Sequence, residues 1–368
     1  MNDEHFLRLA LELAGKGAGQ VSPNPMVGCV LVKEGKVIGR GYHQKYGGPH
    51  AEVNAINSAE ADLTGAVMYV SLEPCSHFGK TPPCADLIIS KGISRVVVGA
   101  LDPNPLVSGK GVKKLIESGI DVTVPLLEDE CKERIKFFLK HITTGMPYIL
   151  VKTAASLNGK VNREPGRPAQ LTCTESAAMV HRLRSEYDLI LTGSGTVTAD
   201  DPMFTVRKAA GRNPAVAILD SSLSISPSAR LFAAGRKVYI FTAMDQDRAK
   251  AELLREKGAE VIEVGKDERG FLLLHEVFSV LGKKGIGSVM AESGPRLTSS
   301  LLASGFTDEF IIYITTEMIA GGENFIHPEF GGVPQGSQLL HTATGSSGTD
   351  ICLTFRTEKS LKHVYRSG

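Results

Sequence analysis

The sequence of 368 residues lacks tryptophan, has few aromatic residues (6%) and carries almost no net charge. With 41 Lys and Arg against 40 Asp and Glu, the formal charge of +1 gives no field that could hold a nucleic acid non-specifically. No apolar run approaches the roughly 18 residues of a membrane span, and residues 1–5 are acidic where a signal peptide would be basic. We therefore expect a cytoplasmic protein that has neither a nucleic acid nor a membrane as its partner.

Cysteine is also scarce, with six residues spread over the chain. In a cytoplasmic protein such cysteines are more often metal ligands or buried thiols than disulfides. The remaining composition, 42% hydrophobic and 22% charged, excludes a disordered chain, a collagen, a coiled coil and a small disulfide-bonded scaffold. The length predicts about two domains, each large enough for a core of its own.

The first part of the chain alternates helical and strand patterns. A helical stripe over residues 6–14 is followed by two strand patterns around a turn at 33–36. The other expected helices cover 51–60, 84–91, 110–118 and 128–141, and the expected strands cover 27–32, 37–41, 67–72, 95–100 and 120–124. This alternation predicts a three-layer α/β domain over residues 1–145, with helices packed on a mixed or parallel sheet.

A turn-rich stretch at 143–147 separates this domain from a second α/β domain over residues 146–368. Its expected helices cover 174–185, 246–257, 270–281 and 295–304. Its expected strands cover 148–152, 187–193, 214–219, 237–242, 259–263, 287–291, 308–315 and 351–355. The strand ending at 193 is expected to lead into a glycine-rich loop.

The strongest functional signal is a His-x-Glu motif, His50 and Glu52, followed by Cys75 after a proline and then by Cys84 in a Cys-x8-Cys spacing. One imidazole and two thiolates give Zn²⁺ three protein ligands and leave a fourth position for water, which is typical of a catalytic zinc site. A carboxylate two residues from the histidine can carry protons between that water and a leaving amine. The pattern favours a zinc-dependent deaminase. The alternatives are buried thiols beside a surface histidine, or a structural zinc site completed by His77.

Four stretches of the first half resemble the deaminase domain of the bifunctional deaminase/reductase family of riboflavin biosynthesis. They are Asn24-Pro-Met-Val-Gly28, Pro49-His-Ala-Glu52-Val, the run 72–85 with its Cys-x8-Cys loop, and Asp102-Pro-Asn-Pro105. That loop separates this family from the tRNA-adenosine, cytidine and deoxycytidylate deaminases. The resemblance implies a cytidine-deaminase-like α/β/α domain in which His50, Cys75 and Cys84 bind zinc and Glu52 is catalytic. It also implies contacts with the pyrimidine and its ribosyl phosphate from Asn24, His43, His77, Lys80 and Asn104.

The second half contains no Gly-x-Gly-x-x-Gly motif in the strand-to-helix context of a Rossmann fold. Two other strand ends, at 193–196 and 292–294, are rich in glycine, and the second precedes a proline typical of a helix start. These segments, with 152–160, 183–184 and 219–221, resemble the reductase half of the same family, which has a dihydrofolate-reductase-like α/β fold. The resemblance implies an NADPH site lined by Ala154, Thr196, Asp200, Ser221 and Gly294. It implies substrate contacts from Arg184, Phe204, Arg207 and Glu292, with the two arginines suited to binding a phosphate.

The second half also departs from the family pattern. Asn158 stands where the family usually has Asp, and residues 166–170 are Gly-Arg-Pro-Ala-Gln where a Gly-x-Ser-x-Trp run is usual. Pro168 and Gln170 thereby remove an expected substrate hydrogen bond and an aromatic surface near the cofactor. Because hydride transfer depends mainly on how cofactor and substrate are positioned, we still expect an active reductase.

The sequence therefore predicts a bifunctional riboflavin-biosynthesis enzyme with zinc and NADPH as cofactors. The first reaction is the hydrolytic deamination of 2,5-diamino-6-ribosylamino-4(3H)-pyrimidinone 5′-phosphate, and the second reduces the ribosyl group to a ribityl group. A homo-oligomer is expected by analogy. The alternatives are an active deaminase with a degenerate, non-reducing second domain, a nucleic-acid-editing deaminase with an accessory binding domain, and a non-catalytic zinc-stabilised binding protein.

Overall fold

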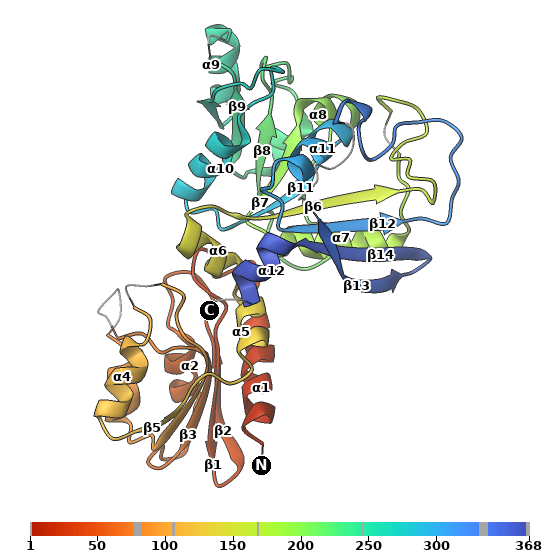
Figure 1. The fold of residues 1–368 in the computed structure, drawn as a ribbon. Helices are drawn as coiled ribbons and strands as arrows, with labels where there is room; N and C mark the ends of the chain where they lie inside the picture. The colour runs from red at the N-terminus through yellow and green to blue at the C-terminus, as the bar shows by residue number, and fades with distance from the viewer. Residues whose placement is uncertain are drawn as a thin grey trace. The chain divides into compact units, whose positions relative to one another are not determined.

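The computed structural model describes residues 2–76, 82–104, 107–167, 169–244, 246–330 and 338–365. Three residues singled out in the sequence, His77, Lys80 and Pro168, lie outside these ranges. The chain forms two compact units, one of Met1–Gly145 with Val364–Gly368 and one of Met146–His363 (Figure 1). In the described part of the chain, no helix combines the length and the apolar character needed to cross a membrane.

A mixed sheet of five strands forms the centre of the first unit, in the order β2-β1-β3-β4-β5. Strand β1 is antiparallel to β2 and β3, whereas β3, β4 and β5 are parallel. The strands are β1 (Gly28–Lys33), β2 (Lys36–Tyr42), β3 (Val67–Leu72), β4 (Arg95–Ala100) and β5 (Asp121–Thr123). The helices are α1 (Asp3–Gly15), α2 (Ala51–Ser58), α3 (Cys84–Ser90), α4 (Lys110–Glu117), α5 (Glu128–Arg134) and α6 (Lys136–Thr144).

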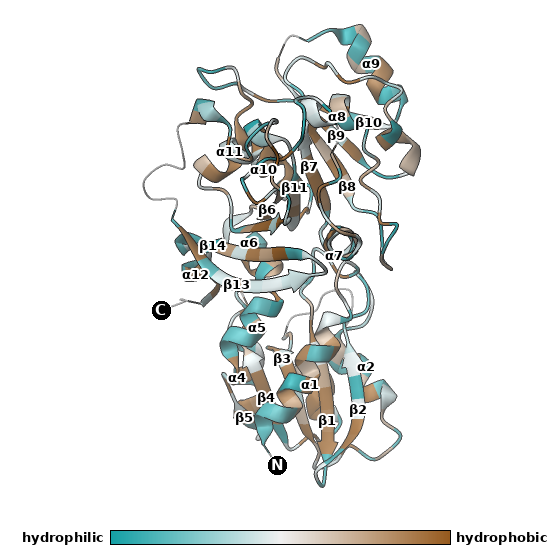
Figure 2. Ribbon diagram, turned by 90° about the vertical axis from the view of Figure 1, so that its right-hand side faces the viewer, coloured by the Kyte–Doolittle hydropathy of each residue, from teal (hydrophilic) through white to brown (hydrophobic). Residues whose placement is uncertain are grey.

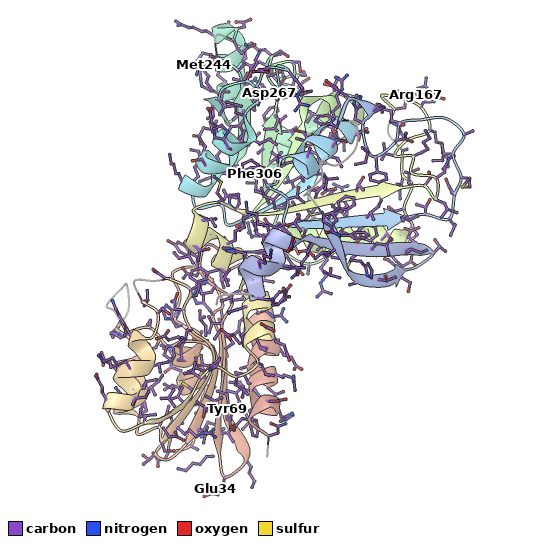
Figure 3. The ribbon with its side chains drawn as sticks, viewed as in Figure 1. Glu34, Tyr69, Arg167, Met244, Asp267 and Phe306 are labelled. Carbon is purple, nitrogen blue, oxygen red and sulfur yellow. The ribbon has the colours of Figure 1, made fainter. Side chains whose placement is uncertain are left out.

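Helices cover both faces of this sheet. Alternate residues of a strand point to opposite faces, so Cys29 and Leu31 of β1 pack with buried residues of α2, α3 and α4. Val30 and Val32 pack with those of α1 and α5. On this second face Tyr69 of β3, labelled in Figure 3, donates a hydrogen bond of 2.8 Å to the Asp3 carboxylate of α1. This arrangement confirms the predicted three-layer α/β/α domain.

One expected helix of the first unit, residues 128–141, is in fact two helices. Ile135 separates α5 from α6 with φ −108° and ψ 17°, outside the α-helical region. Ile135 and Leu139 are nevertheless both buried. The apolar spacing of the sequence therefore continues through the break, which is why the pattern predicts a single helix.

The second unit is built on a sheet of nine strands in the order β10-β9-β8-β7-β11-β6-β12-β14-β13. The strands from β10 to β12 are parallel, and β14 and β13 continue the sheet in antiparallel pairing. The strands are β6 (Tyr148–Ala155), β7 (Leu189–Gly193), β8 (Ala215–Leu219), β9 (Val238–Thr242), β10 (Ala259–Glu263), β11 (Ser288–Glu292), β12 (Glu309–Ile314), β13 (Leu339–Ser347) and β14 (Asp350–Thr357). The helices are α7 (Thr174–Glu186), α8 (Ser194–Asp200), α9 (Arg248–Glu256), α10 (Leu274–Lys283), α11 (Pro295–Ala303) and α12 (Glu358–Tyr365), with short 3-10 turns η1 (Arg230–Ala234) and η2 (Pro328–Phe330).

The parallel strands carry the core of the second unit, which confirms the predicted α/β class. Strands β7 and β8 are strongly hydrophobic, whereas the edge strand β13 is pale in Figure 2 and mostly exposed. The lack of apolar alternation in β13 explains why the sequence does not predict it. The expected glycine-rich loop after β7 is instead the short helix α8, which begins at Ser194 directly after Gly193 in extended conformation.

Candidate active sites

Three potential metal ligands of the first unit lie close together. His50 directly precedes α2, Cys75 follows β3, and Cys84 begins α3. The His50 Nδ1 atom lies 3.6 Å from the Cys75 Sγ atom and 3.3 Å from the Cys84 Sγ atom, and the three atoms all lie within 4.8 Å of one another. Tetrahedral zinc with bonds of about 2.0 Å to nitrogen and 2.3 Å to sulfur places such atoms about 3.6 Å apart. The donor set therefore fits a zinc ion in both chemistry and spacing.

Hydrogen bonds favour a thiolate within this ligand cluster. The backbone N–H of Cys84 donates to the Sγ atom of Cys75 at 3.3 Å. The pKa of Cys75 is lowered by the hydrogen bond from the Cys84 thiol, and the pKa of Cys84 is raised because it would form a second thiolate beside the first. The hydrogen bond with Cys75 raises the pKa of His50. A bound dication would remove the resistance of the pair to double ionisation.

Glu52 lies in the first turn of α2, two residues after His50. Its side chain is buried, with 4% of the residue exposed. Burial raises the pKa of the Glu52 carboxyl. A carboxyl whose pKa is raised toward neutrality can take up and return a proton, as general acid–base catalysis requires.

Asn24 and His43, which the sequence predicts to contact the substrate, lie beside the ligand cluster. The rings of His43 and His50 are 5.7 Å apart between centroids. The His43 Nδ1 atom lies 3.0 Å from the Pro49 carbonyl oxygen and must donate to it, so Nε2 accepts from the Asn24 amide at 3.1 Å. Burial lowers the pKa of His43. The structure thus holds His43 as a neutral ring in one tautomer.

Glu73, which the motif does not single out as a functional residue, connects the ligand cluster to the neighbouring loop. It lies between β3 and Cys75, and its buried carboxylate accepts hydrogen bonds of 2.8 to 3.2 Å from the backbone N–H groups of Asp102, Gly109, Gly111 and Val112. This loop carries Asn104, whose N–H donates to the Asp102 carboxylate at 2.8 Å. The signal in the sequence was an acidic residue directly after a buried apolar strand, because such a carboxylate needs partners.

The predicted cofactor residues of the second unit gather at the carboxyl ends of its parallel strands. Ala154 is the penultimate residue of β6, and Ser221 follows β8. Thr196 follows β7 and Gly294 follows β11, and these two strands are adjacent in the sheet. The Gly294 N–H donates to the Thr196 hydroxyl at 3.1 Å, so the two glycine-rich strand ends are in contact. Asp200 ends α8 and is exposed. Open parallel sheets bind their ligands at this edge.

Arg184 and Glu292, which are predicted to face the substrate, form a buried ion pair. Two hydrogen bonds of 2.6 and 3.0 Å join them, and Lys152, the register partner of Glu292 on β6, lies 3.2 Å from its carboxylate. Burial opposes ionisation of Glu292, but the two cations outweigh it and lower its pKa to about 2. Arg184 is therefore engaged by a carboxylate and is not the free phosphate ligand that its residue type suggests. Lys152 also belongs to this site, although the sequence analysis assigns it no role.

Phe204 and Arg207 lie on a loop that other cationic side chains hold in place. Phe204 is buried with φ 48°, a rare conformation for a bulky residue. Arg184 and Arg236 donate to the carbonyl oxygens of Thr205 and of Met203 and Phe204, respectively. The Arg207 N–H donates to the His181 Nδ1 atom at 2.9 Å. Among the described residues, Arg207 has no carboxylate partner, so it is the predicted arginine that remains able to bind an anion.

Comparisons with known proteins match both halves. Residues 147–352 match the family model of the RibD C-terminal domain, and residues 1–100 match that of the cytidine and deoxycytidylate deaminase zinc-binding region. The riboflavin biosynthesis protein RibD of Aquifex aeolicus is 40% identical over 96% of this chain and 98% of its own length, and that of Escherichia coli is 36% identical over 96% and 99%. This chain belongs to the RibD family.

Solved structures of RibD proteins agree with this assignment. The RibD of Acinetobacter baumannii has a TM-score of 0.86 with this chain at 32% identity, covering 96% of this chain and 98% of its own. A diaminohydroxyphosphoribosylaminopyrimidine deaminase/5-amino-6-(5-phosphoribosylamino)uracil reductase from Thermotoga maritima has a TM-score of 0.84 at 35% identity, with the same coverage of 96% and 98%.

As a member of the RibD family, the chain is a bifunctional enzyme of riboflavin biosynthesis with a deaminase and a reductase activity. Zinc is the cofactor of its deaminase region and NADPH that of its reductase region. These predictions are confirmed. The alternatives of a degenerate second domain, of a nucleic-acid-editing deaminase and of a non-catalytic zinc protein are not favoured.

Asn158, which the sequence analysis interprets as a departure from the family pattern, has a structural role. Its Oδ1 atom accepts hydrogen bonds from the Ser156 hydroxyl at 2.7 Å and from the Ile319 N–H at 3.1 Å, and its Nδ2 atom donates to the Ile319 carbonyl at 2.8 Å. A carboxylate could not make the last bond. Asn158 thus ties the loop after β6 to the segment after β12. Nothing in the structure explains Gln170, which is exposed.

Proposed function

We propose that the first unit deaminates 2,5-diamino-6-ribosylamino-4(3H)-pyrimidinone 5′-phosphate and that the second unit reduces the ribosyl group of the product to a ribityl group. The observation that carries the first step is the cluster of His50, Cys75 and Cys84 with buried Glu52 beside it. The name of the Thermotoga maritima relative, a diaminohydroxyphosphoribosylaminopyrimidine deaminase and 5-amino-6-(5-phosphoribosylamino)uracil reductase, supports the substrate and the order of the two reactions. The cytoplasmic location and a homo-oligomeric state remain predictions from the sequence.

In the proposed deaminase, His50, Cys75 and Cys84 hold the zinc ion. When bound, zinc supplies a Lewis acid that lowers the pKa of a water molecule at its open position. The buried Glu52 carboxyl, whose pKa is raised by burial, would hold a proton and deliver it to the leaving amino group. Its place in the first turn of α2, two residues after His50, supports this role.

The pyrimidine and its phosphate are proposed to contact residues around this cluster. Neutral His43 fixes the orientation of the Asn24 amide through the bond of 3.1 Å between them. Asn24 is thereby oriented to form a hydrogen bond with a polar edge of the pyrimidine. Asn104 is proposed to contact the same substrate, and His77 and Lys80 are proposed to bind its ribosyl phosphate.

In the proposed reductase, NADPH supplies the hydride. Ala154, Thr196, Ser221 and Gly294 bind it along the carboxyl edge of the parallel strands, with Asp200 at the end of α8. Glu292 and Arg184 contact the ribosyl group, and Phe204 and Arg207 line its other side. The rigid ion pairs of Glu292 orient these groups before substrate binds.

The test follows both reactions by mass on the zinc-loaded protein. Supplied with the diamino-pyrimidinone ribosyl phosphate and NADPH, the protein is expected to release the deaminated ribityl product, and without NADPH the deaminated ribosyl compound. Glu52→Gln should keep its zinc but lose deamination by roughly 10²- to 10⁴-fold, while it still reduces the deaminated compound supplied directly. Turnover of neither compound would contradict the proposed substrate.

A further inference from the structure

Arg236 is a half-buried arginine to which the proposed reductase mechanism gives no role. It lies between the 3-10 turn η1 and β9, and its guanidinium donates hydrogen bonds to three backbone carbonyl oxygens. These belong to Met203, to Phe204 at 2.7 Å and to Pro214 at 3.4 Å. Two of the three lie in the loop of residues 203–207, which carries the proposed substrate residues Phe204 and Arg207. The Arg236 side chain therefore ties this loop to the start of β9.

The charge of Arg236 is not balanced by a neighbouring carboxylate. In the part of the chain that the structure describes, no acidic side chain pairs with it, and its buried Nε atom has no hydrogen-bond partner. Burial and the nearby charge of Arg184 lower the pKa of Arg236 to about 10, so the side chain is still charged at neutral pH. A buried cation without a carboxylate is costly. The hydrogen bonds to the loop are the interactions that offset this cost.

The loop needs such support because of its backbone conformation. Phe204 and Asp201 both have left-handed conformations, with φ of 48° and 39°, and such conformations persist only where the surroundings fix them. The Arg184 Cζ atom lies 5.8 Å from the centroid of the Phe204 ring, and Arg184 donates to the Thr205 carbonyl at 3.2 Å. The loop thus lies against the buried ion pair of Arg184 and Glu292.

The same loop orients the Arg207 side chain. The Arg207 Nη1 atom donates to the Thr205 hydroxyl at 2.6 Å, and the Arg207 N–H donates to the His181 Nδ1 atom at 2.9 Å. Thr205 directly follows Phe204, whose carbonyl oxygen Arg236 holds. Arg236 therefore fixes the peptide that leads into Thr205, and Thr205 fixes the guanidinium of Arg207.

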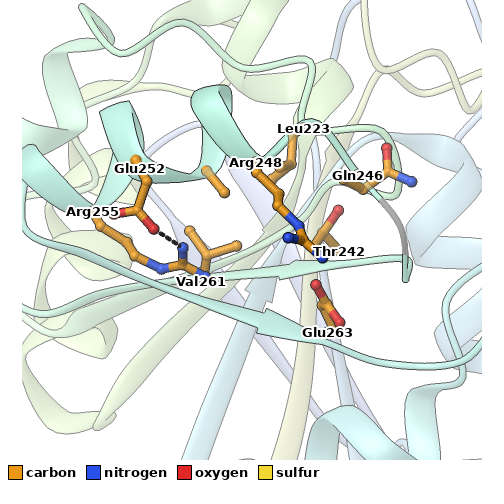
Figure 4. A pocket seen from close by; sticks show the side chains of 9 residues that line it. Leu223, Thr242, Gln246, Arg248, Glu252, Arg255, Val261 and Glu263 are labelled. Carbon is orange, nitrogen blue, oxygen red and sulfur yellow. Dashed lines mark hydrogen bonds and ion pairs between the residues drawn. The ribbon is translucent and has the colours of Figure 1, made fainter.

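Arg236 lies away from the edge of the sheet at which NADPH is proposed to bind. A cavity of about 190 Å³ opens at that carboxyl edge, where Thr242 ends β9 and Glu263 ends β10 (Figure 4). Arg236 precedes the first residue of β9, at the opposite end of that strand, and is not among the residues that line the cavity. A substitution of Arg236 should therefore leave the binding of NADPH intact.

We propose that Arg236 is a positioning residue of the reductase, which holds the loop of residues 203–207 so that Arg207 meets the phosphate of the ribosyl substrate. The inference rests on the proposed reductase function. Arg236 acts through the carbonyl oxygens of Met203 and Phe204, and from there through Thr205 on Arg207. The 5′-phosphate lies at the other end of the ribosyl group from the carbon that accepts the hydride. Arg236 therefore contributes to substrate affinity and not to the hydride-transfer step.

The experiment measures binding of the deaminated ribosyl compound by calorimetry on the full-length, zinc-loaded protein without NADPH, and kcat for its reduction with NADPH. Arg236→Met should weaken binding of the compound by at least about tenfold, because a loop in place in only one molecule in about ten lowers the apparent affinity by that factor. The affinity for NADPH and kcat should both stay within about twofold of the wild type. Lys237→Met removes the same charge from the next residue, which is exposed, and should change binding of the compound by less than about threefold.

A double substitution tests whether Arg236 acts through Arg207. In a protein that already carries Arg207→Met, Arg236→Met should weaken binding of the ribosyl compound by less than about threefold more, because the phosphate contact is already lost. Losses that multiply would contradict the proposed route. Arg236→Lys replaces Arg236→Met if that variant does not fold. It keeps the charge but lacks the planar fork that reaches two carbonyl oxygens, so it should still weaken binding of the compound by at least about threefold and spare NADPH.

The outcomes separate this inference from the proposed function. If the wild-type protein binds and reduces the ribosyl compound and Arg236→Met binds it equally well, the positioning role is wrong and the reductase function stands. Equal losses for the compound and for NADPH in a folded variant also contradict a role through the loop. If the wild-type protein binds neither the compound nor NADPH, the proposed reductase function itself fails, and the inference fails with it. A loss that is confined to the ribosyl compound and that disappears in the Arg207→Met protein supports the role of Arg236.

Discussion

The two units of this chain assemble their sites in different ways. In the first unit, four functional side chains come from two short segments, 50–52 and 75–84, that adjoin two helix starts. In the second unit, the residues come from the ends of four parallel strands and span positions 152–294. A metal site is thus visible as a motif, whereas a dinucleotide site at a sheet edge becomes visible only when the strand order is known.

The two sites also differ in how charge is balanced. In the first, the Cys75 and Cys84 thiols resist joint ionisation, and a bound dication would remove that resistance. The second balances Glu292 with Lys152 and Arg184 inside the protein itself. We therefore expect the first site to depend on an added ion and the second to depend on internal ion pairs.

The largest expected effect concerns the ligand cluster of the first unit. Cys84→Ala removes one of the three proposed zinc ligands, so bound zinc and deamination should both fall to background, a loss of at least about 10³-fold. Reduction of the deaminated compound should stay within about twofold of the wild type, because the substituted site lies wholly in the first unit. Metal analysis and separate assays of the two half-reactions measure these effects.

A matched control is Cys29→Ala. Cys29 is a buried cysteine in β1 of the same unit and is absent from the ligand cluster. This variant should keep its zinc and its deaminase activity. If Cys84→Ala retained stoichiometric zinc, or if both half-reactions failed together in a folded protein, the separation of the two sites would be wrong.

The sequence predicts the first site better than the second for a physical reason. His50, Glu52, Cys75 and Cys84 are residue types with few other uses at that spacing, so the motif carries the chemistry directly. Ala154, Thr196 and Gly294 are common residues whose meaning comes from their positions after neighbouring strands. Only the resemblance to a known family singled them out, and the roles of individual residues remain predictions.

Other features could not be found because they depend on contacts between distant segments. Lys152 lies opposite Glu292 because of the register between β6 and β11. Residues so far apart in the sequence form no local pattern that could reveal this pair. The loop expected after β7 is the helix α8, and the helix expected over 128–141 breaks at Ile135, because packing overrides the local signal in both places.

The second prediction tests the internal ion pairs of the second unit. Glu292→Gln leaves Lys152 and Arg184 buried without their shared carboxylate, which should destabilise this unit by roughly 3–5 kcal/mol. Because the pKa of Glu292 is lowered from 4.5 to about 2, its contribution is present above pH 4.5 and is lost as the pH falls toward 2. The difference between wild type and variant in urea unfolding should therefore shrink over that pH range.

An exposed pair provides the control for that prediction. Glu358 lies 2.6 Å from Lys362 in α12, with side chains more than half exposed. Glu358→Gln should cost no more than about 0.5 kcal/mol. Equal losses for Glu292→Gln and Glu358→Gln would contradict the view that burial makes the Glu292 pairs matter.

The third prediction concerns His181, which accepts a hydrogen bond from the Arg207 N–H and is 5% exposed. Burial, with the nearby charges of Arg184 and Arg207, lowers its pKa from 6.5 to about 4. Between these values the unfolded chain binds a proton that the folded protein does not, so stability should fall by about 2 kcal/mol as the pH drops from 6.5 to 4. His181→Asn keeps an acceptor near Nδ1 but cannot titrate, so its stability should vary less over this range. A slope unchanged from that of the wild type would contradict the neutral state of His181.

The smallest expected effect concerns Asn158, which the sequence analysis interprets as a departure from the family pattern. Asn158→Asp keeps the acceptor for the Ser156 hydroxyl and the Ile319 N–H but loses the amide that donates to the Ile319 carbonyl at 2.8 Å. The carboxylate would face that carbonyl oxygen, so the second unit should lose about 1 kcal/mol of stability. Deamination should not change, because Asn158 belongs to the second unit.

Asn324→Asp is the matched control. Asn324 pairs with Lys160 of the same loop, but its amide makes no hydrogen bond with Ile319 among the described residues. If both variants unfold at the wild-type temperature, the Asn158 amide does not fasten the loop after β6, and the departure from the family pattern at this position is structurally neutral.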